Sequence, residues 1–481
     1  MTTPPYDHAP IPSAPPAGPP PECPAHAGSA EGARLYGPEV EGDYTAAEEA
    51  LRARFGPVAP VTLQGGVPAW LILGYHENLE VMRNPVQFSR DSRHWNIQLD
   101  PDSPLAPLTA WQPLCNLTDG DEHTRLRAAV TQSLTNFSTS QEAGGGGHGV
   151  HRYVVWRSHQ LIDDFVERGS ADLITEFADL LPLRVISRLL GLSETHVPVL
   201  VDSVRDLVSG SATAVASNDQ ITRLLYELVA LKREAPGHDI TSRLIAHKLD
   251  ERLGEEHLRQ EVAEHLRMLL TATQSTTAPL LASTLHMTLT DPRFRGHLAG
   301  GQMTLPNAVE QVLWDAPPFP RLVGRWATVD MELAGHRIRR GDLLVHSLAA
   351  ANRDPLVRPD LHEPMHGNNA HLSFSAGPHE CPGKSLARGI VSAGVDVLQD
   401  RLEGLRLAVP ESEIRERQGL MSRHLDRLAV TFQPRPRKSG GGAPLGRQPQ
   451  PPAVPAPATH APSAEPGQPR GSRTRRILGQ G

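Results

Sequence analysis

One short segment, residues 371–388 (HLSFSAGPHECPGKSLAR), constrains this chain more than any other. It carries Cys381 in a loop rich in glycine and proline, directly ahead of residues that favour a helix. A cysteine in that position has its thiolate stabilised by the helix dipole and by backbone amides that point at the sulfur. Such a sulfur serves as a metal ligand or as a nucleophile. The alternative is a buried structural thiol in a turn, which the combined pattern Phe-x-x-Gly-x-His-x-Cys-x-Gly disfavours.

The neighbours of Cys381 indicate that the loop packs against a bulky group. Gly377 and Gly383 have no side chain, so the backbone can approach a flat or bulky group closely at both positions. Phe374 is placed to shield the sulfur from water. We therefore expect a ligand site around this loop rather than an isolated thiol.

Composition separates a folded body from two tails. The chain has 481 residues, of which 39% are apolar and 21% are charged, enough to bury a core. Its 45 prolines are densest at the two ends. We therefore expect residues 1–40 to form a Pro-rich disordered tail, residues 41–433 a single large domain, and residues 434–481 a Pro- and Arg-rich disordered tail.

Charge and cysteine content limit the partners and the compartment. The formal net charge is −7, and because residues 434–481 are basic, the body is more acidic than this total. General nucleic-acid binding needs a positive field, so we expect no nucleic-acid partner. The three cysteines, Cys23, Cys115 and Cys381, cannot form a disulfide framework, and no secretory leader is evident. The sequence predicts a cytoplasmic protein without a membrane span, because no stretch reaches ~18 consecutive apolar residues.

Helical periodicity dominates the body. Residues 151–192 have apolar positions every three or four residues, with breaks expected at Gly169 and Pro182. Residues 255–289 form the longest periodic run, which Asp291 and the proline after it should end. A helix of that length crosses a whole domain.

Strand signals are fewer. Alternation of apolar and polar residues predicts strands within residues 326–333 and 343–347, separated by turns at Gly335 and Gly341. The fold class is therefore mainly α with minor β.

The cysteine loop resembles the haem-binding signature of the cytochrome P-450 family, and further segments are similar to that family in the same order along the chain. Together the matches cover about residues 40–433 and look like the soluble bacterial and actinomycete members. The resemblance implies the P-450 fold, a single large domain that encloses the haem. The other matching segments are residues 121–127 (DEHTRLR), 325–328 (RWAT), 349–355 (AAANRDP) and 423–428 (RHLDRL).

The resemblance also implies roles for individual residues. Cys381 would be the proximal ligand of the iron in haem b, where a thiolate donates electron density that favours cleavage of the O–O bond. Haem carries two carboxylates that must be paired when partly buried. The residues implied to bind haem are His123, Arg127, Arg325, Phe374, Gly377, His379 and Gly383.

One departure from the family pattern lies in the family's penultimate long helix. The family's Glu-x-x-Arg pair, which bonds to an arginine ahead of the cysteine loop, is replaced here by residues 311–314 (QVLW). Glu310 is followed three residues later by Leu313, so a shift of register does not restore the pair, and the partner position near His366 lacks an arginine. Replacing a whole buried ion network by neutral groups can be almost neutral in free energy. We therefore expect Gln311 and Trp314 to form a rebuilt neutral core, as in the small actinomycete subset that this chain resembles.

A second departure lies in residues 272–276 (ATQST), where the family usually has Ala-Gly-x-Asp/Glu-Thr. In the family the acid and the threonine deliver protons. Thr276 matches the threonine, but Ser275 occupies the acid position and Thr273 the glycine position. Ser275 and Thr276 are the candidate catalytic residues, with proton delivery through water, Gln274 or substrate. The alternative is that both hydroxyls only cap carbonyls of the helix.

The resemblance implies a monooxygenase that inserts one oxygen atom from O2 into a small or medium apolar organic substrate. Electrons would come from a ferredoxin and a ferredoxin reductase or an equivalent donor, since no dinucleotide fingerprint or four-cysteine cluster is present. The alternatives are a peroxide-driven oxygenase and a haem-binding partner or regulatory protein with little turnover.

Overall fold

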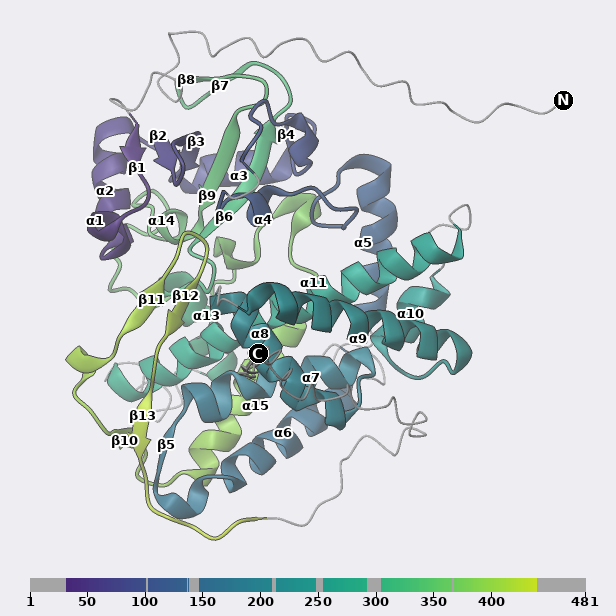
Figure 1. Ribbon diagram of the computed structural model, residues 1–481. Coiled ribbons are helices and arrows are strands. Elements are labelled where there is room, and N and C mark those ends of the chain that lie inside the picture. The colour runs from purple at the N-terminus through teal and green to yellow at the C-terminus, as the bar shows by residue number, and fades with distance from the viewer. Residues whose placement is uncertain are drawn as a thin grey trace, which may run out of the picture. The chain divides into compact units, whose positions relative to one another are not determined.

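A computed structural model describes residues 32–100, 103–135, 137, 147–209, 213–247, 254–291, 304–365 and 367–438 (Figure 1). The chain divides into two units, Met1–Gln448 and Pro449–Gly481, and every described residue belongs to the first. Cys23 and His366 lie outside the described residues.

Helices make up most of this unit, as the periodicity predicts (Figure 1). Helices α6, α7, α11 and α15 pack against one another, and α13 packs on α11 and α15. None of the described helices is both long and apolar enough to cross a membrane. The helices are α1 Pro38–Glu41, α2 Tyr44–Phe55, α3 Tyr75–Arg83, α4 Ala106–Thr109, α5 Gly120–Thr135, α6 Gly147–Asp163, α7 Leu180–Leu190, α8 Val197–Ser209, α9 Ala214–Glu234, α10 Ile240–Ala246, α11 Glu255–Thr290, α13 Leu305–Asp315, α14 Leu348–Asn352 and α15 Lys384–Arg401.

The long predicted helix is present as α11, 36 residues from Glu255 to Thr290. It ends where predicted, because Asp291 adopts an extended conformation ahead of a proline. One feature was missed: Pro279 lies inside the helix. Proline has no N–H, so the carbonyl of Ser275 cannot receive the usual i to i+4 hydrogen bond.

Of the two helix breaks predicted within residues 151–192, the structure has one. Gly169 marks a break, with a φ of 70° between helical residues and strand β5. Pro182 does not interrupt a helix. It lies in the first turn of α7, where its N–H is not needed for a helical hydrogen bond.

A six-stranded sheet in the order β1-β2-β3-β9-β6-β4 is the main β element. The predicted strand at 343–347 is β9, whereas the predicted strand at 326–333 divides into the end of β6 and β7. The register of β6 against β9 shifts between Val323 and Arg325. The strands are β1 Ala33–Arg34, β2 Val58–Leu63, β3 Val67–Ile72, β4 Phe88–Ser89, β5 Ser170–Asp172, β6 Arg321–Ala327, β7 Met331–Leu333, β8 His336–Ile338, β9 Leu343–Ser347, β10 Arg406–Leu407, β11 Glu416–Gln418, β12 Arg423–Leu425 and β13 Ala429–Thr431.

A buried ion pair joins two helices of the core. Arg401, the last residue of α15, donates to Asp163, the last residue of α6, over 2.5 Å. The side chains of Arg401 and Asp163 are 2% and 8% exposed. Removing one partner of such a pair leaves the other charge buried and uncompensated.

We therefore predict that Asp163→Asn lowers the free energy of unfolding by about 3–5 kcal/mol. Urea denaturation followed by circular dichroism measures this loss. A loss below about 1 kcal/mol, the range of exposed pairs, would contradict the prediction.

Candidate functional site

The cysteine loop has the local structure that the sequence predicts. Cys381 lies between a short 3-10 turn at Gly377–His379 and helix α15. Its N–H donates to the carbonyl of Phe374 over 2.9 Å, which closes the loop. Burial raises the pKa of the thiol above its usual value, although the backbone N–H of Gly383 opposes that shift. Metal coordination deprotonates a thiol outright, so this sulfur suits a metal ligand better than a free nucleophile.

The two glycines of the loop have different reasons for lacking a side chain. Gly377 has a φ of 71°, and a Cβ there would lie 2.6 Å from the carbonyl oxygen of Met82. Contact with the end of α3 is therefore sufficient to require glycine at this position. A Cβ at Gly383 would lie 3.8 Å from the sulfur of Cys381, so Gly383 leaves room beside the sulfur.

Four predicted cationic residues converge beside this loop. The ring of His123, on α5, lies 4.2 Å from the ring of His379 between centroids. Arg325, on β6, is 2% exposed, and its guanidinium donates to the carbonyl of Phe88 over 2.9 Å. Arg127 of α5 donates to the carbonyl of Glu380, next to Cys381. The structure thus brings together residues of α5, β6 and the cysteine loop, and Arg127 and Glu380 are 253 positions apart in the sequence.

The electrostatics of this cluster show an excess of positive charge. Burial and the neighbouring charge of Arg90 together lower the pKa of Arg325 to about 9, although Asp119 opposes the shift. Burial likewise lowers the pKa of His379 to about 3, despite its bond to Asp119. Arg90, which the sequence analysis missed, is buried and donates to the carbonyls of Asn116, Val323 and Gly324.

Asp119 is a second residue that the sequence analysis missed. It accepts from the Nε2–H of His379 over 2.9 Å and from the hydroxyl of Ser89 over 2.6 Å. Burial alone would raise the pKa of Asp119, but these hydrogen bonds outweigh it and lower the pKa to about 2. Its position two residues before the matching segment 121–127 was the available signal.

These residues fit a dianionic group such as haem. The Nε2 atom of His123 is buried and has no hydrogen-bond partner in the described part of the chain. Within the same described ranges, neither Arg127 nor Arg325 forms an ion pair. A buried cation and an unpartnered ring nitrogen both require an acceptor, which haem carboxylates would provide.

The middle of α11 faces accessible space. Residues 271–276 are half-buried or exposed, whereas residues 277–282 are buried. Thr276 donates its hydroxyl to the carbonyl of Ala272 over 2.8 Å, and Ser275 donates to the same carbonyl over 3.4 Å. Both hydroxyls thus make the bonds that the carbonyl-capping alternative expects. Gln274 turns elsewhere, donating to the carbonyl of Asp179 over 3.1 Å.

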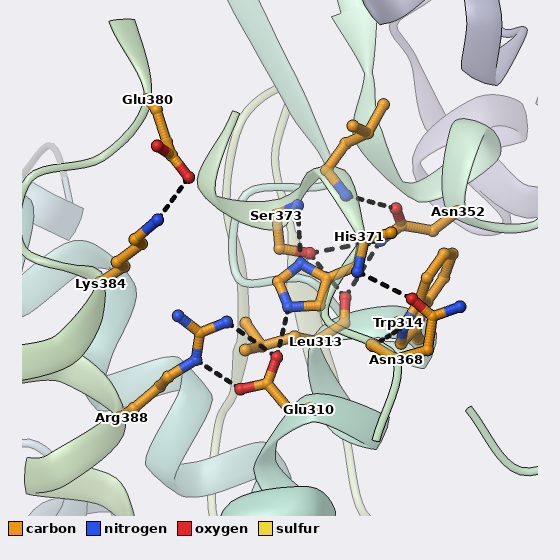
Figure 2. A network of polar contacts seen from close by, with 12 residues as sticks. Glu310, Leu313, Trp314, Asn352, Asn368, His371, Ser373, Glu380, Lys384 and Arg388 are labelled. Atoms are coloured by element: carbon orange, nitrogen blue, oxygen red, sulfur yellow. Dashed lines mark hydrogen bonds and ion pairs between the residues drawn. The ribbon is translucent and has the colours of Figure 1, made fainter. Parts of the chain in front are cut away.

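At the Glu-x-x-Arg position, Gln311 and Trp314 are buried and bind backbone groups, and Figure 2 shows the bond of Trp314. The carbonyl oxygen of Gln311 accepts from the backbone N–H of Met365 over 2.6 Å. The indole N–H of Trp314 donates to the carbonyl of Asn368 over 2.7 Å. Both side chains therefore hold the segment around residue 366 through its backbone, so an arginine partner is not needed there.

Two ion pairs that the sequence analysis missed lie next to Gln311 and Trp314. Glu310 is 4% exposed, and its carboxylate binds Arg388 of α15 and His371 (Figure 2). In addition, Arg358 donates to Asp315 over 2.6 Å. These partners lie 43 to 78 residues away in the sequence, at positions other than the expected one near residue 366, and so were missed.

Comparison with known proteins finds relatives along most of the chain. It is 30% identical over 396 residues to nocardicin C N-oxygenase of Nocardia uniformis, covering 78% of this chain and 92% of that protein. It is 30% identical over 389 residues to cytochrome P-450 105A3 of Streptomyces carbophilus, covering 79% and 91%. The solved structure of CYP154A1 from Streptomyces coelicolor matches with a TM-score of 0.69 and 30% identity, covering 81% of this chain and 98% of that one. A search of protein-family models finds no match.

Restoring the family's acid at position 311 is predicted to destabilise this chain. In Gln311→Glu the new carboxylate would face Asp315, to which the amide of Gln311 now donates over 2.8 Å. We expect a loss of roughly 3 kcal/mol in the free energy of unfolding at neutral pH. Repulsion raises the pKa of the new carboxyl in the folded state, so the loss shrinks as the pH falls through that pKa.

Denaturant titrations at several pH values measure this effect. Gln418→Glu is the matched control, because Gln418 also donates to a carboxylate, that of Glu416 over 2.9 Å, but is only half-buried on β11. Equal losses in the two variants, or a loss at position 311 that does not depend on pH, would contradict the prediction.

Proposed function

The chain belongs to the cytochrome P-450 family and is a haem-thiolate monooxygenase, and from this premise we propose that Cys381 ligates the iron of haem b within one domain. This domain begins before the predicted boundary at residue 41, because strand β1, Ala33–Arg34, belongs to the six-stranded sheet. The observation that carries this assignment is the excess of buried positive charge beside Cys381. A bound haem supplies activation of dioxygen, supported by its thiolate ligand.

The proposed binding residues divide into two groups. Arg127, Arg325 and His123 would pair the haem carboxylates, since buried anions require cationic or N–H donors. His379 would join them when its Nε2–H, which Asp119 accepts here, turns to a carboxylate. Phe374, Gly377 and Gly383 shape the loop around the sulfur. Asp119 orients His379 by accepting its Nε2–H.

On the other side of the proposed site, Ser275 and Thr276 are the proposed catalytic residues. Pro279 leaves the Ser275 carbonyl without its helical donor, and both hydroxyls lie on the accessible stretch of α11. A water held by this carbonyl and the Thr276 hydroxyl would carry the proton that the family's acid usually provides. A serine hydroxyl is a weak acid near neutral pH, so it orders the water rather than supplying the proton.

We propose a small or medium apolar organic molecule as substrate and a ferredoxin with its reductase as electron donor, in the cytoplasm. The names of the relatives support an organic substrate, although they do not bear on its polarity. They include a 2-hydroxy-5-methyl-1-naphthoate 7-hydroxylase from Streptomyces carzinostaticus and a mycinamicin IV hydroxylase/epoxidase from Micromonospora griseorubida. A peroxide-driven oxygenase is the second candidate, because Ser275 replaces the acid that the ferredoxin-driven reaction normally uses.

The assignment of Cys381 is tested by the reduced, CO-bound absorbance spectrum, with haem type and content measured as the pyridine complex. We expect a red-shifted Soret band for the full chain and its loss in Cys381→Ala. Retention of the same band in Cys381→Ala would overturn the ligand assignment, and failure to bind haem would overturn the proposed function.

The proton route is tested at position 275. If proton supply limits the reaction, Ser275→Asp should raise the amount of product formed per NADPH consumed. The increase should be at most about 10²-fold, the effect of a positioned general acid. Ser275→Ala is the matched control and should lower this ratio. An unchanged ratio in Ser275→Asp would place proton delivery elsewhere.

Wild-type turnover that is faster with peroxide than with ferredoxin and reductase would favour the second candidate, the peroxide-driven oxygenase.

A further inference from the structure

A buried carboxylate on α13 connects to the cysteine loop. Glu310 accepts from two nitrogens of Arg388, one of them Nη2 over 2.8 Å, and from Nε2 of His371 over 2.9 Å (Figure 2). Arg388 lies in the first turns of α15, directly after the loop, and His371 lies just before the loop. Glu310 therefore holds both ends of the segment that carries Cys381.

The first route to the loop runs through His371. The Nδ1 atom of His371 accepts from the backbone N–H of Ser373 over 3.2 Å. The hydroxyl of Ser373 donates to the carbonyl of Leu313 on α13 over 2.6 Å. These bonds fix the backbone immediately before Phe374 (Figure 2).

The second route runs through Arg388. Its guanidinium carbon lies 4.6 Å from the ring centroid of Phe374, a cation–π contact. The carbonyl of Phe374 accepts the N–H of Cys381. Arg388 and Phe374 thus connect Glu310 to the backbone of Cys381.

The charges in this network are balanced by one arginine. Because Nδ1 of His371 accepts a hydrogen bond, its proton is on Nε2 and the ring is neutral. Arg388 is then the cation that compensates Glu310. Burial would raise the pKa of Glu310, but the bonds from His371 and Arg388 lower it to about 2, so the carboxylate is ionised at neutral pH.

We propose that Glu310 is a positioning residue for the proximal ligand, which holds the Cys381 loop through His371 and Arg388. This inference rests on the proposed function, in which Cys381 ligates haem. The neutral Gln311 and Trp314 hold the segment around residue 366, and Glu310 provides the ionic contact to the ligand loop itself.

The test compares two variants that each neutralise a buried carboxylate paired with an arginine of α15. Glu310→Gln keeps the shape and the bond to His371 but leaves Arg388 without its charge partner. Asp163→Asn does the same to Arg401, 13 residues further along α15 and so about 20 Å away. Both variants should lose stability, which controls for a merely structural effect.

Two readouts report on the ligand loop alone. We expect Glu310→Gln to move part of the reduced, CO-bound Soret band to the blue and to speed haem transfer to apomyoglobin by about 10-fold, as for other residues that support a metal ligand. Asp163→Asn should change neither. Arg388→Lys, which keeps the charge but loses the planar fork over Phe374, should give an intermediate result and remains measurable if Glu310→Gln does not fold.

Each outcome bears on a different claim. Wild-type spectra and haem-transfer rates in Glu310→Gln and Arg388→Lys would overturn the positioning role while leaving the proposed function intact. Equal changes in Glu310→Gln and Asp163→Asn would reduce the role of Glu310 to stability. Absence of the red-shifted band in the wild-type protein would overturn the proposed function and this inference with it.

Discussion

Buried positive charge beside Cys381 is the constraint on which the arrangement of this site depends. Arg325 and Arg90 are both buried, and Asp119 is the carboxylate that meets this cluster. Desolvating two guanidinium groups is costly unless anions compensate them. The site is therefore complete only with an anionic ligand, which explains why β6, α5 and the cysteine loop present donors to one place although they come from distant parts of the chain.

On helix α13 the chain separates two tasks by charge. Gln311 and Trp314 hold a backbone segment with neutral hydrogen bonds, which need no ionic partner. Glu310 and Arg388 form a bidentate ion pair between α13 and α15. A neutral replacement of one network is tolerated when all its members change together. Glu310 and Arg388 keep their charges because each is the partner of the other. This pair also contacts the loop that carries Cys381.

The sequence predicts the fold class and the local structure of the cysteine loop because those signals are local. Helical periodicity predicts α11 to within one residue at its C-terminal end, and glycine, proline and cysteine spacing predicts the loop before α15. Asp119, Arg90 and the partners of Glu310 were missed because their contacts join residues far apart in the chain. Pro182 was misread because the effect of a proline depends on its position within the helix.

The middle of α11 shows how one backbone change can accompany the loss of an acid. Where the family has a carboxylic acid, this chain has Ser275, and four residues later it has Pro279. The proline removes the N–H that would occupy the Ser275 carbonyl, so an acceptor becomes free where an acidic side chain is absent. A backbone carbonyl can bind and order a water, just as a hydroxyl can, but it has no proton to supply. On the proposed route a site for water would be retained while acidity is lost, so proton supply is the step in which we expect this chain to differ most from its relatives.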